Sequence, residues 1–319
     1  MNSQDPIGIS VVIPLYNKAE TVVRAIDSVL AQRQVAAELI VVDDGSSDRS
    51  LAISQGYGDR IRLIRQANRG PSAARNRGVK EARFPWVSFL DADDEYLPGC
   101  LAHHAACLSA RPDVRATMVS FCFIDRCGNT KNEVLTARIG QSSADAEILF
   151  VEDFRSALVI NVHIGAVCVS RDLFLAIGGF DEQLVSWEIT DFLVRLVRHT
   201  GTIAVSSHIR LLSYDTPDSQ STKTHRKIPY VTRVTSRLLD EMESIPENEQ
   251  KPLLAQMKSF LYTLWELGAL GEFHRLVGRA HGYFRLHELD DRFTRLGLLP
   301  LPALRALHGL RGIKQRLLS

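Results

Sequence analysis

Three apolar runs, each of which breaks directly into polar residues, constrain the fold of this chain most. They cover residues 9–14, 39–42 and 86–90. Such runs are typical of parallel strands that are covered on both faces. Helical patterns separate them, and strands are expected near residues 9–14, 37–42, 61–65, 86–90 and 116–124. This alternation predicts right-handed crossovers and an α/β fold with a mostly parallel sheet flanked by helices.

The polar residues at the strand ends predict a binding crevice, because ligands of open α/β sheets lie outside the carboxyl ends of the strands. The third run ends in Asp91, Asp93 and Asp94. Side chains alternate along a strand, so Asp91 and Asp93 are expected to point the same way. Two converging carboxylates suit Mg²⁺ or Mn²⁺. A solvated turn is the alternative, and a second acidic cluster at residues 43–44 favours the site.

A cationic helix is expected after the Gly-Pro break at residues 70–71. Small residues flank Arg75, and we expect this side chain to face the crevice. Arg77 is expected on a solvated helix face.

A second set of acids lies further along the chain. Residues 126–161 are polar and irregular, which predicts a flap or an insertion on the acceptor side. Order is expected to return at residues 162–169, with Ser170 as the cap of a short helix. In the following segment, Glu188 and Asp191 share one face if the segment is helical. They are either partners of the helix dipole or include a catalytic base.

Composition narrows the functional classes. A net charge of +1 does not predict a nucleic-acid partner. The five cysteines are odd in number and lack a CxxC pair, which indicates reduced thiols in a cytoplasmic setting, and no zinc site is expected. The first residues do not resemble a secretory signal, and the most apolar window, residues 260–270, is too short to span a bilayer.

Taken in order, five blocks resemble the successive motifs of family 2 glycosyltransferases of GT-A fold. These blocks are residues 12–17, 41–48, 73–78, 90–94 and 178–182. The resemblance covers roughly residues 8–220. It implies a Rossmann-like GT-A glycosyltransferase domain at residues 1–225, followed by a helical C-terminal region at residues 226–319. It also implies an inverting enzyme that uses a nucleotide diphosphate donor, usually a UDP-sugar, together with a divalent metal.

The resemblance also assigns roles to single residues. Asp44 is expected to accept a hydrogen bond from the uracil N–H, and Asp93 to bind the Mn²⁺ or Mg²⁺ ion. An ion at Asp93 would neutralise the charge that develops on the diphosphate leaving group. The full set of expected nucleotide contacts is Pro14, Tyr16, Glu20, Asp44, Arg75 and Asp91.

The chain departs from the family pattern at the catalytic base. The family typically has Glu-Asp where this chain has Glu188 and Ile189, and the Asp is the base. Either Glu188 or Asp191 takes the proton, with Glu188 favoured for its longer reach, or transfer activity is lost or altered. The loop at residues 214–221 also lacks the usual His, for which His225 is a weak substitute.

The function expected from these observations is a metal-dependent inverting glycosyltransferase that acts on a glycan or lipid-linked acceptor. Two alternatives remain: a non-catalytic sugar-nucleotide binding homologue, prompted by Ile189, and a sugar-nucleotide nucleotidyltransferase. Against the second alternative, this chain has no glycine-rich phosphate loop near its N-terminus. Residues 303–319 contain four basic residues and no acid. This tail fits either a packed helix or peripheral contact with the inner face of a membrane.

Overall fold

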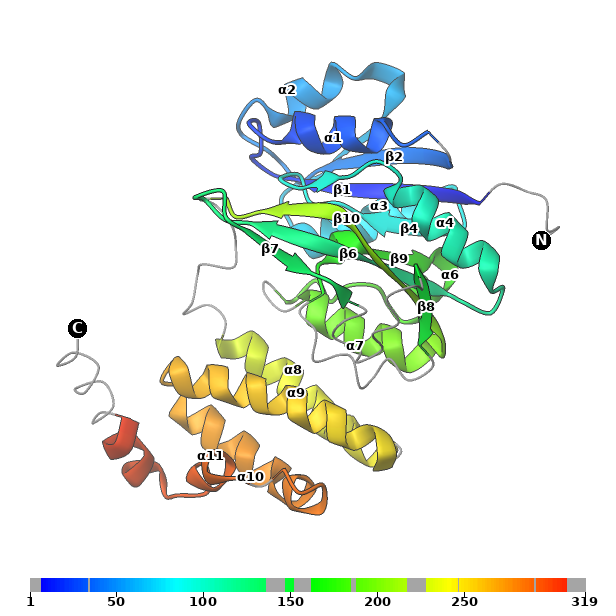
Figure 1. Cartoon of the computed structure of the whole chain (residues 1–319). Helices are drawn as coiled ribbons and strands as arrows, with labels where there is room; N and C mark the ends of the chain where they lie inside the picture. Colours follow the sequence, from blue (N-terminus) through cyan, green and yellow to red (C-terminus); the bar gives the residue numbers. More distant parts are fainter. Residues whose placement is uncertain are drawn as a thin grey trace. The chain divides into compact units, whose positions relative to one another are not determined.

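The computed structural model divides the chain into two compact units, residues 1–219 and residues 220–319 (Figure 1). The sequence placed this boundary after residue 225. The structure describes residues 7–33, 35–135, 147–151, 162–184, 188–216, 228–245, 247–289 and 291–308.

The first unit contains a ten-stranded sheet whose main path runs β3-β2-β1-β4-β9-β6-β10-β5. At its parallel end, β1 (Gly8–Leu15) lies between β2 (Ala36–Asp43) and β4 (Trp86–Phe89), and β3 (Arg62–Arg65) lies beyond β2. β6 (Ala116–Ile124) is the fifth strand that the sequence predicted. The α/β fold with a mostly parallel sheet is therefore confirmed, with strand bounds within about two residues of those expected.

The other strands are largely antiparallel and were not predicted. β9 (Val167–Ser170) pairs antiparallel with both β4 and β6. β10 (Ile203–Tyr214) runs parallel to β6 and antiparallel to β5 (Glu95–Tyr96). The prediction that residues 126–161 are irregular is wrong in two places, because β7 (Thr130–Glu133) pairs with β6 and β8 (Ile148–Val151) pairs with β10.

Helices connect and cover the strands of this unit. α3 (Pro71–Glu81) packs against β1 and β2, and α4 (Cys100–Ala110) packs against β6 and β10. Gly78 allows the close approach of α3, because a Cβ atom there would lie 2.3 Å from Val12 Cγ1. Further described helices of this unit are α1 (Val22–Leu30), α2 (Ser50–Gln55), α6 (Arg171–Ala176) and α7 (Glu188–Thr200).

An aromatic cluster fixes the position of α7. Phe180 lies between Phe89 of β4, Phe174 of α6 and Phe192 of α7, with ring centroids 5.4, 5.6 and 4.6 Å away. All four rings are almost completely buried. Packing of this kind holds the first turn of α7 close to the end of β4. Ser170 caps α6, as expected, by accepting a hydrogen bond from Leu173 N.

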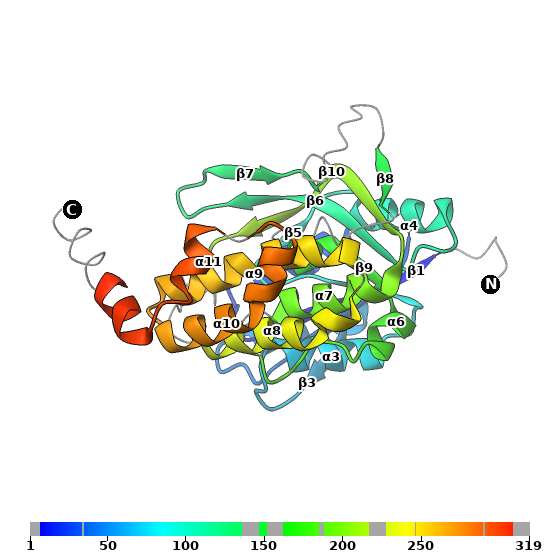
Figure 2. The ribbon, with the colours of Figure 1, turned by 90° about the horizontal axis from the view of Figure 1, so that it is seen from below.

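The second unit is helical. Its main helices α8 (Ile228–Glu241), α9 (Glu247–Glu266) and α10 (Leu270–Leu286) lie alongside one another (Figure 2). The short α11 (Arg292–Leu296) begins with a capping box at Asp291, and residues 301–308 are helical. Among the residues that the structure describes, no helix is both long and apolar enough to cross a membrane. Residues 309–319 of the basic tail lie outside the described residues.

Candidate active site

The ends of the first two strands are tied together by side-chain hydrogen bonds. Asn17, which has a positive φ of 50°, follows β1. Its Oδ1 accepts hydrogen bonds from Ser47 N at 2.8 Å and Asp48 N at 3.3 Å, and its own N–H donates to Ser46 Oγ at 3.1 Å. Because β1 and β2 are adjacent parallel strands, this contact brings the two predicted strand ends to one edge of the sheet.

Asp44 lies just after β2 and is 3% exposed. Its Oδ1 accepts hydrogen bonds from Gln66 Nε2 and Arg69 N, both at 2.9 Å, and its Oδ2 accepts one from Gly70 N at 2.7 Å. Asp44 therefore holds the segment that leads into α3. A carboxylate offers about four acceptor positions, so these bonds leave capacity on Oδ2 for a further donor. Its contact with uracil stays a prediction.

Arg75 joins two acids that are far apart in the sequence. Its side chain is 4% exposed, and its Nη2 lies 2.6 Å from Asp91 Oδ1. Its Nη1 lies 3.5 Å from Glu188 Oε1, at the start of α7. Burial favours a higher pKa for Asp91, but the charge of Arg75 and its other neighbours outweigh burial and lower the pKa. Arg75 thus lies inward, whereas Arg77 is exposed and pairs with Glu81.

The acidic run after β4 forms a turn. The strand ends at Phe89, and Asp94 N donates to Asp91 O at 3.0 Å. The expected alternation of Asp91 and Asp93 along a strand is therefore wrong, because a turn sets their directions. Asp93 Oδ2 instead lies 2.7 Å from Lys18 Nζ and accepts a hydrogen bond from Thr216 Oγ1 at 2.9 Å.

Asp94 and His163 complete this acidic group. Asp94 is 2% exposed, and its Oδ2 lies 3.2 Å from His163 Nε2, which is also 3.9 Å from Asp91 Oδ2. Burial, and then the charges of Asp91 and Asp93, raise the pKa of Asp94 well above its usual value. Gly165 N donates to His163 Nδ1 at 3.1 Å, so a neutral His163 carries its proton on Nε2 and donates it toward Asp94.

The sequence did not reveal that Asp94 contacts a histidine, and it did not suggest His163 as a site residue. Asp94 was treated as part of an acidic run, and His163 lies about 70 residues away, beside β9, whose pairing was not predicted. The available signal was a polar ring in an otherwise apolar stretch at residues 162–169. Such a ring is buried only when it has a polar partner.

The two candidate bases differ in their surroundings. Glu188 has an 11% exposed side chain that faces Arg75. Asp191 has a 2% exposed side chain, and its Oδ2 accepts hydrogen bonds from Arg195 Nε at 3.0 Å and Nη2 at 2.7 Å. The structure therefore brings Glu188, and not Asp191, into contact with the Arg75–Asp91 pair. Residues from 217 onward in the predicted donor loop, and His225, lie outside the described residues.

The other residues that were expected to contact the nucleotide lie at and just after the end of β1. Pro14 is opposite Val42 in the β1–β2 register. Tyr16 is 47% exposed and Glu20 is exposed. Between them, Lys18 reaches Asp93, which places this segment beside the acidic turn.

Asn76 fastens α3 to the turn that precedes α7. Its Nδ2 donates to Phe180 O at 2.9 Å and to Glu182 Oε1 at 3.1 Å, and its Oδ1 accepts a hydrogen bond from Phe180 N at 2.9 Å. Gly179 has a φ of +62°, and a Cβ atom there would lie 2.6 Å from Asn76 Oδ1. This contact ties α3 to the segment before α7, and Arg75 of α3 lies 3.5 Å from Glu188 of α7.

Sequence and structure comparisons place this chain among known proteins. Residues 10–155 match the family described as glycosyl transferase family 2. The chain is 43% identical over 101 residues to the uncharacterized glycosyltransferase YibD of Escherichia coli, which covers 31% of this chain and 29% of that protein. It is 47% identical over 92 residues to the succinoglycan biosynthesis protein ExoO of Rhizobium meliloti, which covers 28% of this chain and 26% of that protein.

A longer match has lower identity. The uncharacterized glycosyltransferase RT0329 of Rickettsia typhi is 29% identical over 223 residues, which cover 70% of this chain and 68% of that protein. Among solved structures, S. aureus TarS 1–349 superimposes with a TM-score of 0.65 at 18% identity, over 91% of this chain and 90% of that chain. TarS 1–349 has also been solved in complex with UDP-GlcNAc, and that structure matches with a TM-score of 0.65 at 17% identity. The fold is thus of the GT-A type, and residues 10–155 match the glycosyl transferase family 2 domain.

Proposed function

We propose that this protein is an inverting glycosyltransferase that moves a sugar from a UDP-sugar to a glycan or lipid-linked acceptor. The observation that carries the proposal is the ion-pair network in which Arg75 joins Asp91 and Glu188, because it gathers α3, the end of β4 and the start of α7 around one point. The relation to TarS, solved with UDP-GlcNAc, supports a UDP-sugar donor. The relation to ExoO, named for succinoglycan biosynthesis, supports a polysaccharide acceptor.

In this reaction the acceptor hydroxyl oxygen attacks the anomeric carbon from the face opposite the diphosphate. The new glycosidic bond forms as the bond to the β-phosphate oxygen breaks, and UDP leaves with the bonding electrons. Attack from the opposite face inverts the anomeric configuration. The hydroxyl proton goes to a carboxylate, which contributes roughly 10²–10⁴-fold to the rate in enzymes of this type.

Glu188 is the better candidate for that carboxylate. Its side chain is partly exposed, and its Oε1 lies 3.5 Å from Arg75 Nη1, a long contact that leaves acceptor capacity on the carboxylate. The Oδ2 atom of Asp191 already accepts two hydrogen bonds from Arg195.

The acidic turn has the chemistry of a divalent metal site. Asp91, Asp93 and Asp94 supply hard carboxylate oxygens, which suit Mg²⁺ or Mn²⁺. Asp94 Oδ2 is buried and lies 3.2 Å from His163 Nε2, so the imidazole is beside the same group of acids. A bound cation would offset the repulsion among the three acids, and it would supply charge compensation for the departing diphosphate. Lys18 already neutralises part of the charge at Asp93.

A panel of labelled UDP-sugars with Mn²⁺ tests this proposal. We expect UDP release with at least one donor, and we expect Asp93→Asn to abolish it. Arg77→Gln is the matched control, because Arg77 lies on the same helix as Arg75 but is exposed, and it should leave turnover unchanged. UDP binding without turnover under any acceptor would support the non-catalytic homologue. Formation of a UDP-sugar from a sugar phosphate would support the nucleotidyltransferase.

A further inference from the structure

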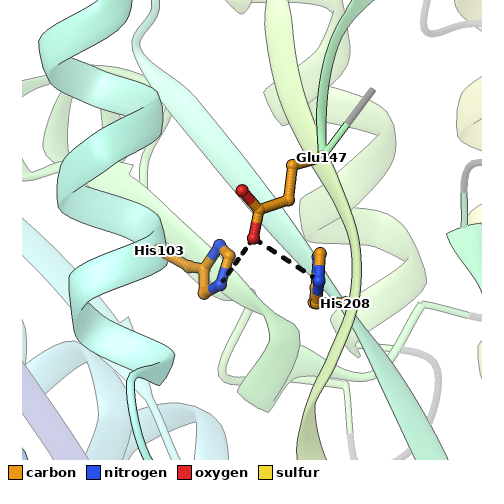
Figure 3. A group of neighbouring side chains, drawn as sticks. All are labelled: His103, Glu147 and His208. Carbon is orange, nitrogen blue, oxygen red and sulfur yellow. Dashed lines mark ion pairs between the residues drawn. The ribbon is translucent and has the colours of Figure 1, made fainter. Parts of the chain in front are cut away.

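A second cluster of ligand-type side chains lies away from the acidic turn. It consists of His103 on α4, His208 on β10 and Glu147, which precedes β8 (Figure 3). Glu147 Oε1 lies 3.7 Å from His103 Nε2 and 3.4 Å from His208 Nε2. The two imidazole rings stack with centroids 5.1 Å apart and an angle of 27° between their planes.

The backbone positions all three residues. The register between β10 and β6 shifts between Val205 and Ile209, so His208 lies in a bulge of β10. Bulges commonly redirect a side chain out of the regular alternation. Ser207 N, in the same bulge, donates to Glu147 O at 3.2 Å, and Ser206 pairs with Ile148 in the β8–β10 ladder. The bulge therefore presents His208 next to the residue that carries the carboxylate.

We infer that His103, Glu147 and His208 form a Zn²⁺ site. Zinc bonds to imidazole nitrogen and carboxylate oxygen are about 2.0–2.2 Å long, so ligands at two corners of a tetrahedron lie about 3.4 Å apart. The two measured separations of 3.4 and 3.7 Å fit this spacing. Two imidazoles and one carboxylate leave the fourth corner for water, which is a common zinc arrangement.

The exposure of the three side chains also suits a metal that enters from solvent. The side chains of Glu147, His208 and His103 are 59%, 41% and 13% exposed. Glu147 is thus free to move the few tenths of an ångström that the longer separation requires. None of the five cysteines takes part, so the cysteine pattern could not have predicted this site.

Arg210 and Glu147, the charged groups next to His103, have opposite effects on zinc binding. Burial, and then the charge of Arg210, lower the pKa of His103, which keeps the ring neutral and able to bind a metal. Arg210 Nη2 lies 2.8 Å from His103 Nε2, so Nε2 of the neutral ring accepts a hydrogen bond from the guanidinium. Zinc must displace that guanidinium from Nε2. Arg210 therefore weakens zinc binding, while Glu147 strengthens it.

A bound ion would connect α4, β10 and the residue that leads into β8. Because zinc would bind the folded state, it should raise the unfolding temperature of the protein. The inference is independent of the glycosyltransferase proposal, since none of its residues takes part in the network of Arg75.

Calorimetric titration with Zn²⁺ in excess Mg²⁺ tests the site, because Mg²⁺ competes at oxygen-only sites but poorly at imidazole sites. We expect His208→Ala to remove one zinc equivalent and Glu147→Gln to weaken that equivalent at least tenfold. Arg210→Gln should tighten it. His199→Ala, at an exposed histidine of the same unit, is the matched control and should change nothing.

Thermal unfolding gives a second readout that does not depend on how well His208→Ala folds. Zn²⁺ should raise the unfolding temperature of the wild type, and this rise should be reduced in Glu147→Gln, a conservative change at an exposed side chain. The inference is overturned if the wild type binds no zinc under these conditions. It is also overturned if the His208 and Glu147 variants bind zinc with the stoichiometry and affinity of the wild type.

Discussion

Arg75, Asp91 and Glu188 illustrate how far single residues could be predicted from the sequence. Asp91 and Arg75 were expected at the site from their motifs, and the structure places them in one ion pair. Glu188 was one of two candidates, because helical spacing alone does not say which acid faces the crevice. The distinction depends on Arg195, which pairs with Asp191 one turn later and was not considered. Local patterns thus predicted the candidates, and tertiary partners separate them.

The first prediction concerns these two acids. Glu188→Gln should lower sugar transfer roughly 10²–10⁴-fold by removing the base, with little change in UDP affinity. Asp191→Asn should retain transfer but lose about 1–3 kcal/mol of unfolding free energy, since Arg195 keeps its charge and loses a carboxylate. Turnover, UDP calorimetry and urea denaturation measure the three quantities. The reverse pattern, with transfer lost in Asp191→Asn alone, would assign the base to Asp191.

The second prediction concerns Asp44. Asn at this position replaces one acceptor oxygen by an NH₂ group that faces a backbone or side-chain N–H, so at least one of the present hydrogen bonds is lost. We expect Asp44→Asn to lower the unfolding free energy by about 1–3 kcal/mol. Asp59→Asn, at an exposed position, is the control and should stay within about 0.5 kcal/mol of the wild type. Equal stability of the two variants in urea denaturation would contradict the structural role of Asp44.

At the scale of whole elements, β1 to β4 and β6 were predictable from the sequence, whereas β5 and β7 to β10 were not. The predicted strands alternate with helical patterns, and this alternation is visible locally in the sequence. β9 and β10 join the sheet between and beside strands that are distant in the sequence. Their partners depend on which sheet edges remain open once the parallel part has formed. That information is not local, so β9 was seen as ordered but not as the strand that joins the two halves.

The third prediction tests the connection between α3 and the turn before α7. Ala at residue 179 would have to adopt a φ of +62° and place its Cβ 2.6 Å from Asn76 Oδ1. Both effects disfavour the folded turn, and we expect a loss of about 1–3 kcal/mol on urea denaturation. Gly128→Ala is the control, since its φ is +82° but its Cβ would meet nothing within 4 Å. A larger loss for Gly128→Ala than for Gly179→Ala would argue against the contact with Asn76.

The fourth prediction concerns the cap of α11. Asp291 accepts hydrogen bonds from Phe293 N and Thr294 N, both at 3.0 Å, and pairs with Lys258. Asp291→Ala should cost about 1 kcal/mol of stability, because it removes the cap. Asp291→Asn keeps a capping oxygen and should lose no more than the surface ion pair, within about 1 kcal/mol. Thermal unfolding ranks the variants, and an Asn variant as unstable as the Ala variant would show that the loss comes from the ion pair with Lys258 and not from the cap.

At the scale of the molecule, the two units have different roles in the proposal. The residues proposed to bind the donor and to catalyse transfer all belong to the first unit, residues 1–219. From the sequence, the boundary was placed after residue 225, at the change from alternating strands and helices to helices rich in Leu and Arg. It could not predict the His103–Glu147–His208 cluster, because its members lie on α4, before β8 and in a bulge of β10.

The affinity of the protein for UDP, with and without Mn²⁺, tests the central claim most directly. The account holds that acids from separate strand ends bind a uridine diphosphate together with a divalent ion. Calorimetric titrations with UDP, GDP and dTDP should therefore give the tightest binding for UDP with Mn²⁺, and Asp93→Asn should remove the gain that Mn²⁺ provides. UDP binding of equal strength without metal would contradict the role of the acidic turn, and absence of UDP binding would contradict the account as a whole.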